Sequence, residues 1–199
     1  PERPNSLDAT NISATGFTAN WEASPRATGY VLSVATDAAF TNILPGYDKW
    51  WDGQVLSFDV TDLDPGTTYY YRTRAYNIAG TSTFGNVISL TTEKAEQTIT
   101  FDALSAVTYG DADMDLAATA SSGLSVSYSS QDESVATVSG NILTIIGPGT
   151  TTITASQEGD AQYLPAIPVD QELQVDVKEL TVINASADNK VYDGSDDAI

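Results

Sequence analysis

Apolar and polar residues alternate along most of the chain with a period of two. Phe17, Ala19 and Trp21 are separated by polar residues, and residues 30–34 follow the same spacing. Successive side chains of a β-strand point to opposite faces of a sheet, so this spacing predicts strands with one buried face. No window of useful length shows the 3.6-residue period of an amphipathic helix. The pattern predicts an all-β fold.

The second half of the chain continues this pattern and adds regular turn signals. Residues 142–146, 153–155 and 173–177 alternate in the same way, and Ser and Thr occupy many of their polar positions. Turn-forming residues such as Gly147-Pro148-Gly149 recur at intervals of roughly 8–12 residues. Many short strands separated by turns at this spacing are typical of β-sandwiches.

Charge divides the chain at one point. The whole sequence has 27 acidic and 8 basic residues, a net charge of -19. Residues 1–94 carry 10 acids and 6 bases, whereas residues 95–178 carry 12 acids and a single base, Lys178. The change falls within residues 93–97, E-K-A-E-Q, which contain neither Gly nor Pro. We interpret this segment as a semi-rigid joint between two packed modules.

The predicted organisation is therefore three consecutive parts. Residues 1–94 and 95–178 are each long enough for a sandwich with its own core. Residues 179–199 are too few to bury a core and are expected to be the truncated start of another module. The predicted fold class is all-β, with two tandem immunoglobulin-like β-sandwiches and a short C-terminal fragment of a third module.

Composition excludes several kinds of function. The chain has no His and no Cys, which rules out a Ser-His-Asp triad, a thiol nucleophile and a conventional zinc site. The negative charge disfavours nucleic acid and anionic lipid, and no run approaches the roughly 18 apolar residues of a membrane span. The first residue is Pro1 and Met114 is the only methionine, so we expect a processed chain or a piece of a longer protein.

Residues 1–93 resemble a fibronectin type III domain. Trp21 falls on the second predicted strand, where that family buries its core tryptophan, and the run L-D-P-G-T-T-Y-Y-Y-R-T-R-A-Y-N-I-A-G-T-S begins at Leu63. The resemblance implies that Gly66 forms the turn and that the hydroxyl of Tyr69 ties the loop to the backbone, as in a tyrosine corner. Thr73 replaces the family's usual valine, which is expected to weaken the core slightly.

Residues 97–178 resemble a bacterial immunoglobulin-like repeat. The runs S-S-Q-D-E-S-V-A-T-V-S-G-N and G-P-G-T-T-T-I-T-A carry the resemblance. We expect Val135 to anchor one strand, and Gly149 to form a tight turn into the strand that contains Ile153. The later run N-K-V-Y-D-G is similar to the start of a YDG-type repeat, which commonly follows such modules. Together these resemblances imply a secreted or surface-exposed bacterial protein.

One candidate metal site lies in the second half. Asp111, Asp113 and Asp115 stand in the run G-D-A-D-M-D, and their spacing can direct three carboxylates at one calcium ion. The EF-hand pattern is absent, because Leu116 occupies its glycine position and Ser122 its glutamate position. The alternative is that the three side chains share the solvent face of a strand.

Two groups of aromatic residues are candidates for ligand binding. Tyr47, Trp50 and Trp51 cluster in a loop or edge strand, where exposed rings can stack on a sugar. The alternative is that these rings pack at the end of the sandwich or on the neighbouring module. The other group is a stripe on one outward face of a predicted strand, made by Tyr70, Arg72, Arg74 and Tyr76. This stripe predicts an anion or planar-ligand site or, alternatively, cross-strand stabilisation with cation–π contacts.

These observations favour a non-enzymatic structural or adhesive function. We expect tandem modules of a larger secreted or cell-surface bacterial protein that act as a stalk or spacer and adhere to a surface. The alternative is a carbohydrate-binding or spacer accessory region of a secreted hydrolase. The expected partners are other domains of the parent protein and an extracellular glycan or a host or cell-surface protein. We expect a monomer without a cofactor, unless calcium binds the second module.

Overall fold

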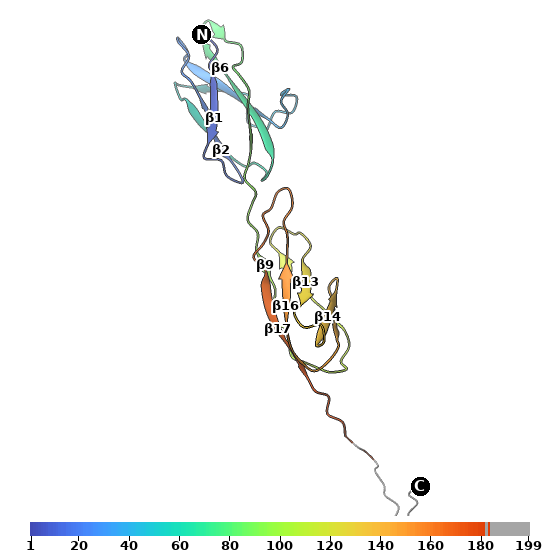
Figure 1. Cartoon of the computed structure of the whole chain (residues 1–199). Helices are drawn as coiled ribbons and strands as arrows, with labels where there is room; N and C mark the ends of the chain where they lie inside the picture. The colour runs from blue at the N-terminus through green and yellow to red at the C-terminus, as the bar shows by residue number, and fades with distance from the viewer. Residues whose placement is uncertain (182, 184–199) are drawn as a thin grey trace, which may run out of the picture.

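The computed structural model describes residues 1–181 and residue 183, and gives the backbone alone for residues 49–52 (Figure 1). Every helix or strand assigned in this part of the chain is a β-strand, which confirms the all-β prediction. The described residues contain no helix with the length and hydrophobicity needed to cross a bilayer. Most of the predicted third part, residues 179–199, including the run that resembles a YDG-type repeat, lies outside the described residues.

The first module, residues 1–94, is built from two antiparallel sheets. One sheet has the strand order β1-β2-β5; the other has the order β4-β3-β6-β7, with β8 also paired to β6. The strands are β1 (Ser6–Thr10), β2 (Phe17–Trp21), β3 (Gly29–Ala35), β4 (Lys49–Asp52), β5 (Ser57–Val60), β6 (Thr68–Asn77), β7 (Gly80–Thr81) and β8 (Ile88–Thr91).

The two sheets enclose one hydrophobic core. Alternate residues of β2 and β6 are buried, as the period-two pattern predicts for both strands. Aromatic rings from the two sheets meet in this core, with centroid distances of 5.6 Å between Phe17 and Tyr71 and 5.7 Å between Trp21 and Tyr30. Aromatic side chains bury the largest apolar areas, so these pairs stabilise the packing of the sheets.

Strand β3 differs from the expected alternation, because all seven of its residues are buried. Val31 and Ser33 pair with Arg74 and Arg72 of β6, and the hydroxyl of Ser33 donates to the Oδ1 atom of Asp48 at 2.7 Å. The arginine side chains and the loop between β3 and β4 thus cover the outer face of the strand. Residues from other segments of the chain bury this face, so the local pattern could not indicate it.

The second module, residues 95–178, contains three small sheets. Their strand orders are β10-β17-β16-β13, β11-β15-β14 and β12-β9, and the β10–β17 pairing is parallel. The strands are β9 (Ile99–Thr100), β10 (Val107–Thr108), β11 (Met114–Asp115), β12 (Thr119–Ala120), β13 (Ser127–Ser130), β14 (Ala136–Ser139), β15 (Ile142–Ile145), β16 (Gly149–Ser156) and β17 (Val169–Asp176).

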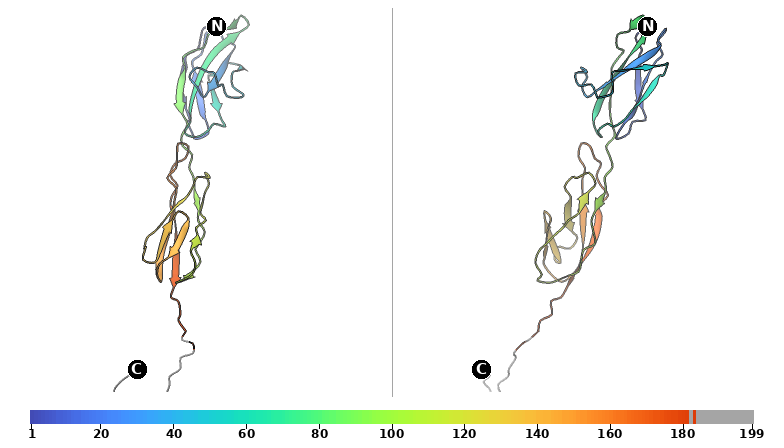
Figure 2. Two further views of the ribbon diagram at one scale, coloured as in Figure 1. Left: turned by 90° about the vertical axis from the view of Figure 1, so that its right-hand side faces the viewer. Right: turned by 180° about the vertical axis from the view of Figure 1, so that it is seen from behind.

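The second module has a core of its own. Leu143, Ile153 and Leu173 are fully buried in it, and the ring of Phe101 packs edge-on against Tyr128 with centroids 5.7 Å apart. The buried residues of the first core fall within residues 17–90, and those of the second within residues 99–175. The two modules lie end to end, with Pro1 at the end of the first module remote from the second (Figures 1 and 2).

Candidate functional site

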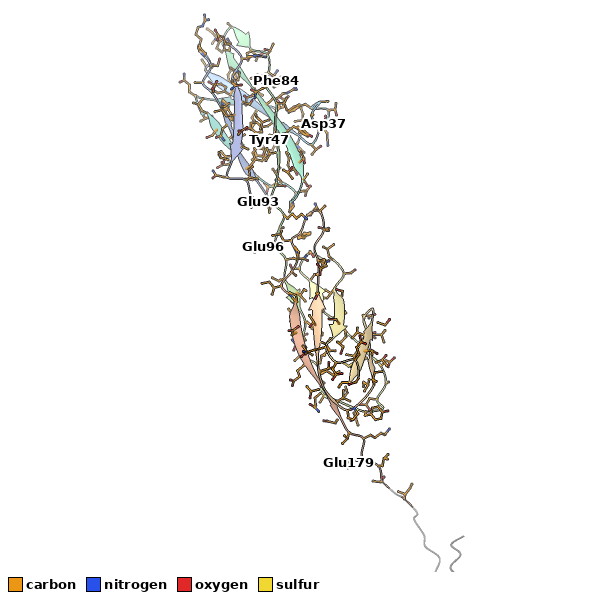
Figure 3. All side chains as sticks on the ribbon, in the orientation of Figure 1. Asp37, Tyr47, Phe84, Glu93, Glu96 and Glu179 are labelled. Atoms are coloured by element: carbon orange, nitrogen blue, oxygen red, sulfur yellow. The ribbon has the colours of Figure 1, made fainter. Side chains whose placement is uncertain are left out.

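The loop between β3 and β4, residues 36–48, presents the first candidate residue, Tyr47. Asp37 organises the start of this loop, because its carboxylate accepts hydrogen bonds from the backbone amides of Ala39, Thr41 and Asn42 at 3.0, 3.1 and 2.7 Å (Figure 3). The bonds from Thr41 and Asn42 are the largest causes that hold the pKa of Asp37 below its ordinary value of 3.8. The loop is therefore held by hydrogen bonds at its start.

Tyr47 is half-buried and held on two sides. Its ring packs edge-on against Phe58 of β5 at a centroid distance of 6.3 Å, and its hydroxyl accepts a hydrogen bond from the Thr61 amide at 3.3 Å. Burial raises the pKa of the Tyr47 hydroxyl, and the nearby Asp62 carboxylate acts in the same direction. Tyr47 is therefore a neutral, oriented ring at physiological pH.

Tyr47 lines a pocket of about 400 Å³ that is mostly apolar. A second, more polar pocket of about 350 Å³ shares Thr61 and Asp62 with it, so the two adjoin, and we call the two pockets together the hollow. The first pocket is lined by Leu44, Pro45, Gly46, Tyr47, Phe58, Thr61, Asp62 and Leu63. The second is lined by Asn11, Ser13, Thr15, Gly16, Phe17, Thr18, Asp59, Val60, Thr61 and Asp62.

The chemistry of this hollow suits an uncharged polar ligand. Aromatic rings provide an apolar wall, and hydroxyl, amide and carboxylate groups provide hydrogen-bond acceptors and donors beside it. Among the described residues that line the hollow there is no lysine or arginine.

The tryptophans predicted to act with Tyr47 lie in β4. The backbone register pairs Trp50 with Val31 and Trp51 with Tyr30. Their side chains lie outside the described part of the structure. A binding surface that combines all three rings therefore stays a prediction.

The arginines of β6 form a stack that the sequence indicated only in part. The guanidinium carbon of Arg72 lies 3.9 Å from the ring centroids of both Phe40 and Phe84, and that of Arg74 lies 4.7 Å from Phe84. Arg74 also contacts Asp48 at 3.8 Å. The predicted cation–π alternative is thus present, with Phe40 and Phe84 from two loops as aromatic partners. The pattern within residues 70–76 could not indicate Phe40 and Phe84, because both lie in other segments of the chain.

The three aspartates of the candidate calcium site have separate surroundings. Asp111 accepts a hydrogen bond from the Thr108 amide at 2.8 Å, and Asp115, in β11, accepts one from the Asn141 side chain at 3.2 Å. Asp113 is exposed in the turn before β11. Within the described residues, no group of three or more acidic side chains is placed to hold a metal ion.

The architectural residues predicted in the first module occupy the expected places. Trp21 is 3% exposed in the core, and the hydroxyl of Tyr69 accepts a hydrogen bond from the Asp64 amide at 3.0 Å. Gly66 has a φ of +57° in the intervening turn. This closed loop is the tyrosine corner that the sequence predicted.

Residues 2–91 match the fibronectin type III family. The first module is a fibronectin type III domain. Both the family match and the geometry of this domain cover Trp21 and the tyrosine corner, so the predicted resemblance is confirmed for this part of the chain. The second module is an all-β region without an assigned family.

The architectural residues predicted for the second module lie around its core. Val135 is 5% exposed immediately before β14, and Ile153 is fully buried in β16. Gly149 begins β16 with a φ of +147°, and a Cβ atom there would lie 2.9 Å from the Cγ2 atom of Val135. The close approach to Val135 therefore favours glycine at this position.

Solved structures similar to the fibronectin type III domain come from diverse proteins. The sixth such domain of human fibronectin type III domain containing protein 3 is 26% identical, with a TM-score of 0.39, over 48% of this chain and 87% of that one. The FN5 domain of Drosophila Lar is 21% identical, with a TM-score of 0.36, over 48% and 99% of the two chains.

A bacterial enzyme also contains a similar region. The β-1,2-glucanase from Parabacteroides distasonis is 15% identical, with a TM-score of 0.40, over 47% of this chain but only 13% of the glucanase. The domain assignment rests on the family match and the domain's geometry, because the TM-scores of these likenesses are low. No curated protein sequence matches the chain.

Proposed function

We propose that the chain is a pair of non-enzymatic structural and adhesive modules of a larger bacterial protein. In this role the modules act as a stalk or spacer that projects other domains of the parent protein from a cell surface or within a secreted assembly. The observation that carries the proposal is the serial arrangement of two separately packed cores (Figure 1). Modules of this kind set a distance without performing chemistry.

The same proposal covers the family of the second module, its lack of catalysis and the oligomeric state of the chain. Residues 95–178 act as a bacterial immunoglobulin-like repeat, supported by the sequence runs that contain Val135, Gly149 and Ile153. The absence of His and Cys from the sequence supports a non-catalytic role. The net charge of -19 supports a monomer that resists self-association at a surface.

Exchange of the modules within the parent protein tests the spacer function. Residues 1–178 are replaced by an unrelated pair of β-sandwich modules of equal length, and in a second variant they are deleted. The activity of the parent at the cell surface is then measured. We expect the exchange to retain activity and the deletion to lose it. Full activity after deletion, or loss of activity after a well-folded exchange, would contradict a spacer function.

A second candidate function, glycan binding by an accessory region of a secreted hydrolase, is favoured by the hollow beside Tyr47. An oriented ring next to hydroxyl and carboxylate groups matches the needs of a neutral sugar. Sugar rings present an apolar face to an aromatic residue and hydroxyls to the polar rim.

Titration with soluble polysaccharides tests this second function. Neutral polysaccharides should change the tryptophan fluorescence and bind in calorimetry, and Tyr47→Ala should abolish both effects. Tyr70→Ala is the matched control, because Tyr70 is half-buried in β6 and does not line the hollow. Equal binding by the Tyr47→Ala variant, or no binding by the unsubstituted chain, would rule out a glycan site at this hollow.

A further inference from the structure

The connection between the two modules consists of residues 92–98, and its first residues are held by the fibronectin type III domain. Thr92 is buried, its amide donates to the Thr67 carbonyl at 3.0 Å, and its hydroxyl donates to the Asp64 carbonyl at 2.7 Å. The amide of Glu93 donates to the Ser13 carbonyl at 3.1 Å. Residues 92 and 93 are therefore a continuation of the first module.

The following residues of the connection are held by the second module. Ala95 forms a parallel bridge with Tyr163: its amide donates to the Gln162 carbonyl at 2.8 Å, and its carbonyl accepts from the Leu164 amide at 2.9 Å. The Nζ atom of Lys94 donates to the Asp160 carbonyl at 2.5 Å. Residues 94 and 95 are thus held by hydrogen bonds to the second module.

Gln97 anchors the connection more deeply in the second module. Its side chain is 6% exposed, and its Nε2 atom donates to the Gln157 side chain and to the Leu164 carbonyl, both at 2.8 Å. The Gln97 Oε1 atom accepts from the Ser122 hydroxyl. A buried amide with satisfied donors and acceptor is costly to displace.

The loop that receives the connection, residues 159–164, is organised by its own hydrogen bonds. The carboxylate of Asp160 accepts from the amides of Gln162 and Tyr163 at 2.7 and 2.9 Å, and the Asp160 amide donates to the Tyr163 carbonyl at 3.1 Å. This loop therefore presents the carbonyls of Asp160, Ala161 and Gln162 in fixed positions.

Gly66 brings the two modules into direct contact. Its amide donates to the Glu93 carbonyl at 3.0 Å, and the tyrosine-corner turn places it against the loop of the second module. A Cβ atom at Gly66 would overlap the carbonyl oxygen of Ala161 and would lie 3.2 Å from the Cα atom of Gln162. The contact therefore requires glycine for steric reasons, in addition to the φ of +57°.

From these contacts we infer that the Gly66 turn and the Asp160–Leu164 loop form a docking interface that fixes the angle between the two modules. Glu93 is hydrogen-bonded to the first module and Lys94 to the second, so these two consecutive residues are held by different modules. The loop of the second module is the partner that the turn of the first module fits. This inference does not depend on the proposed function, because a fixed joint is compatible with a spacer and with a glycan-binding region.

Distance measurement between spin labels on the full chain tests the interface. The chain has no cysteine, so Thr81→Cys and Glu172→Cys, both at exposed positions, introduce the only two labelling sites. Double electron–electron resonance should give a narrow distance distribution for this labelled chain. Insertion of Gly-Ser-Gly between Glu93 and Lys94 should broaden it, because the insertion separates the two held segments.

Gly66→Ala tests the contact itself. We expect this variant to shift or broaden the distance distribution, whereas Gly140→Ala should leave it unchanged. Gly140 is the matched control, because its φ is +62° and nothing lies within 4 Å of a Cβ atom built there. The two substitutions therefore impose similar backbone strain, but only the Cβ atom added at Gly66 would overlap the other module.

Two results of these measurements would contradict a fixed angle between the modules. A distribution for the labelled chain as broad as that of the insertion variant would overturn the inference, as would a folded Gly66→Ala variant with an unchanged distribution. Tryptophan fluorescence reports whether the first module is folded, since all three tryptophans lie within residues 1–94. If Gly66→Ala does not fold, the comparison between the labelled chain and the insertion variant decides the question. Neither result depends on the activity of the parent protein.

Discussion

Several buried hydroxyl groups of the fibronectin type III domain form hydrogen bonds with the backbone or with one another. Tyr30 accepts a hydrogen bond from the Ser24 amide at 2.8 Å, and Tyr71 donates to the Leu7 carbonyl. Thr73, the residue that replaces the family's usual valine, is fully buried, and its hydroxyl lies 3.2 Å from that of Ser6. The expected weakening of the core at Thr73 is thus offset by a hydrogen bond between two strands.

Thr73→Val is therefore expected to destabilise the domain, although it restores the family's usual residue. It leaves the buried Ser6 hydroxyl without this partner, which costs about 1–3 kcal/mol. The double variant Ser6→Ala/Thr73→Val should recover most of this loss. Urea unfolding followed by tryptophan fluorescence measures both. Equal or higher stability of the Thr73→Val variant alone would show that the hydroxyl pair contributes nothing.

Asp37 gives the domain a pH-dependent contribution. Its folded pKa lies below 3.8, so the ionised carboxylate stabilises the fold above this pH, and the contribution is lost as the pH falls through the folded pKa. Asp37→Asn should therefore lower the melting temperature at about pH 7, and the difference from the parent chain should shrink towards about pH 2. Thermal melts followed by tryptophan fluorescence measure this difference.

Asp132→Asn is the control for that experiment. Hydrogen bonds from Ser134 lower the pKa of Asp132 in a similar way, but Asp132 belongs to the second module, which contains no tryptophan. Its effect should be small when unfolding is followed by tryptophan fluorescence. A difference between the parent and Asp37→Asn that stays constant over the whole pH range would refute the electrostatic explanation.

At the scale of strands, the sheet that contains β3 is covered on both faces. The core covers one face, and the stack of Phe40, Arg72 and Phe84 lies over the other. Burial lowers the pKa of Arg72, yet the group stays charged at physiological pH. A planar cation between two rings joins β6 to two loops that are distant in sequence.

Arg72→Met tests this stack, because methionine keeps an apolar stem and removes the charge. We expect a loss of about 0.5–2 kcal/mol in the free energy of unfolding, the range for cation–π contacts. A double-mutant cycle with Phe84→Leu should show coupling between the two positions. Arg72→Lys should lose part of the stability, because a lysine does not present a planar group to both rings. Additive effects in the cycle would show that the two side chains do not interact.

At the scale of the molecule, charge distinguishes the two modules. The second module has 12 acidic residues and one basic residue, whereas the fibronectin type III domain has 10 and 6. The folded second module therefore concentrates negative charge that ions in the solvent can screen. The two modules also have separate cores, so their stabilities can respond differently to the same change in solvent.

Added salt should stabilise the second module more than the first. Raising sodium chloride from about 0.01 M to about 1 M shortens the screening length from about 30 Å to about 3 Å. Tryptophan fluorescence reports the melting of residues 1–94 alone, whereas far-ultraviolet circular dichroism reports both modules. The melting temperature of the transition that only circular dichroism detects should rise more with salt than that of the transition that fluorescence detects. Potassium chloride should act in the same way, and an equal shift of both transitions would show that charge repulsion in the second module is unimportant.

The sequence by itself was sufficient for the all-β class and for many of the core positions. Trp21, Tyr69 and Ile153 could be assigned because the period of a strand is local: a residue's neighbours along the chain decide which face it occupies. The tyrosine corner was expected from the resemblance of this run to the fibronectin type III family, and its hydrogen bond joins Tyr69 to Asp64 across a single turn.

The tertiary structure decided what depends on residues far apart along the chain. The outer face of β3 is buried by Arg72, Phe40 and loop residues, and the hollow beside Tyr47 forms where its loop meets β5 and Asp62. The steric need for glycine at Gly66 arises from Ala161 in the other module. Local periodicity carries no information about these contacts, because each is made between segments that only the packed chain brings together.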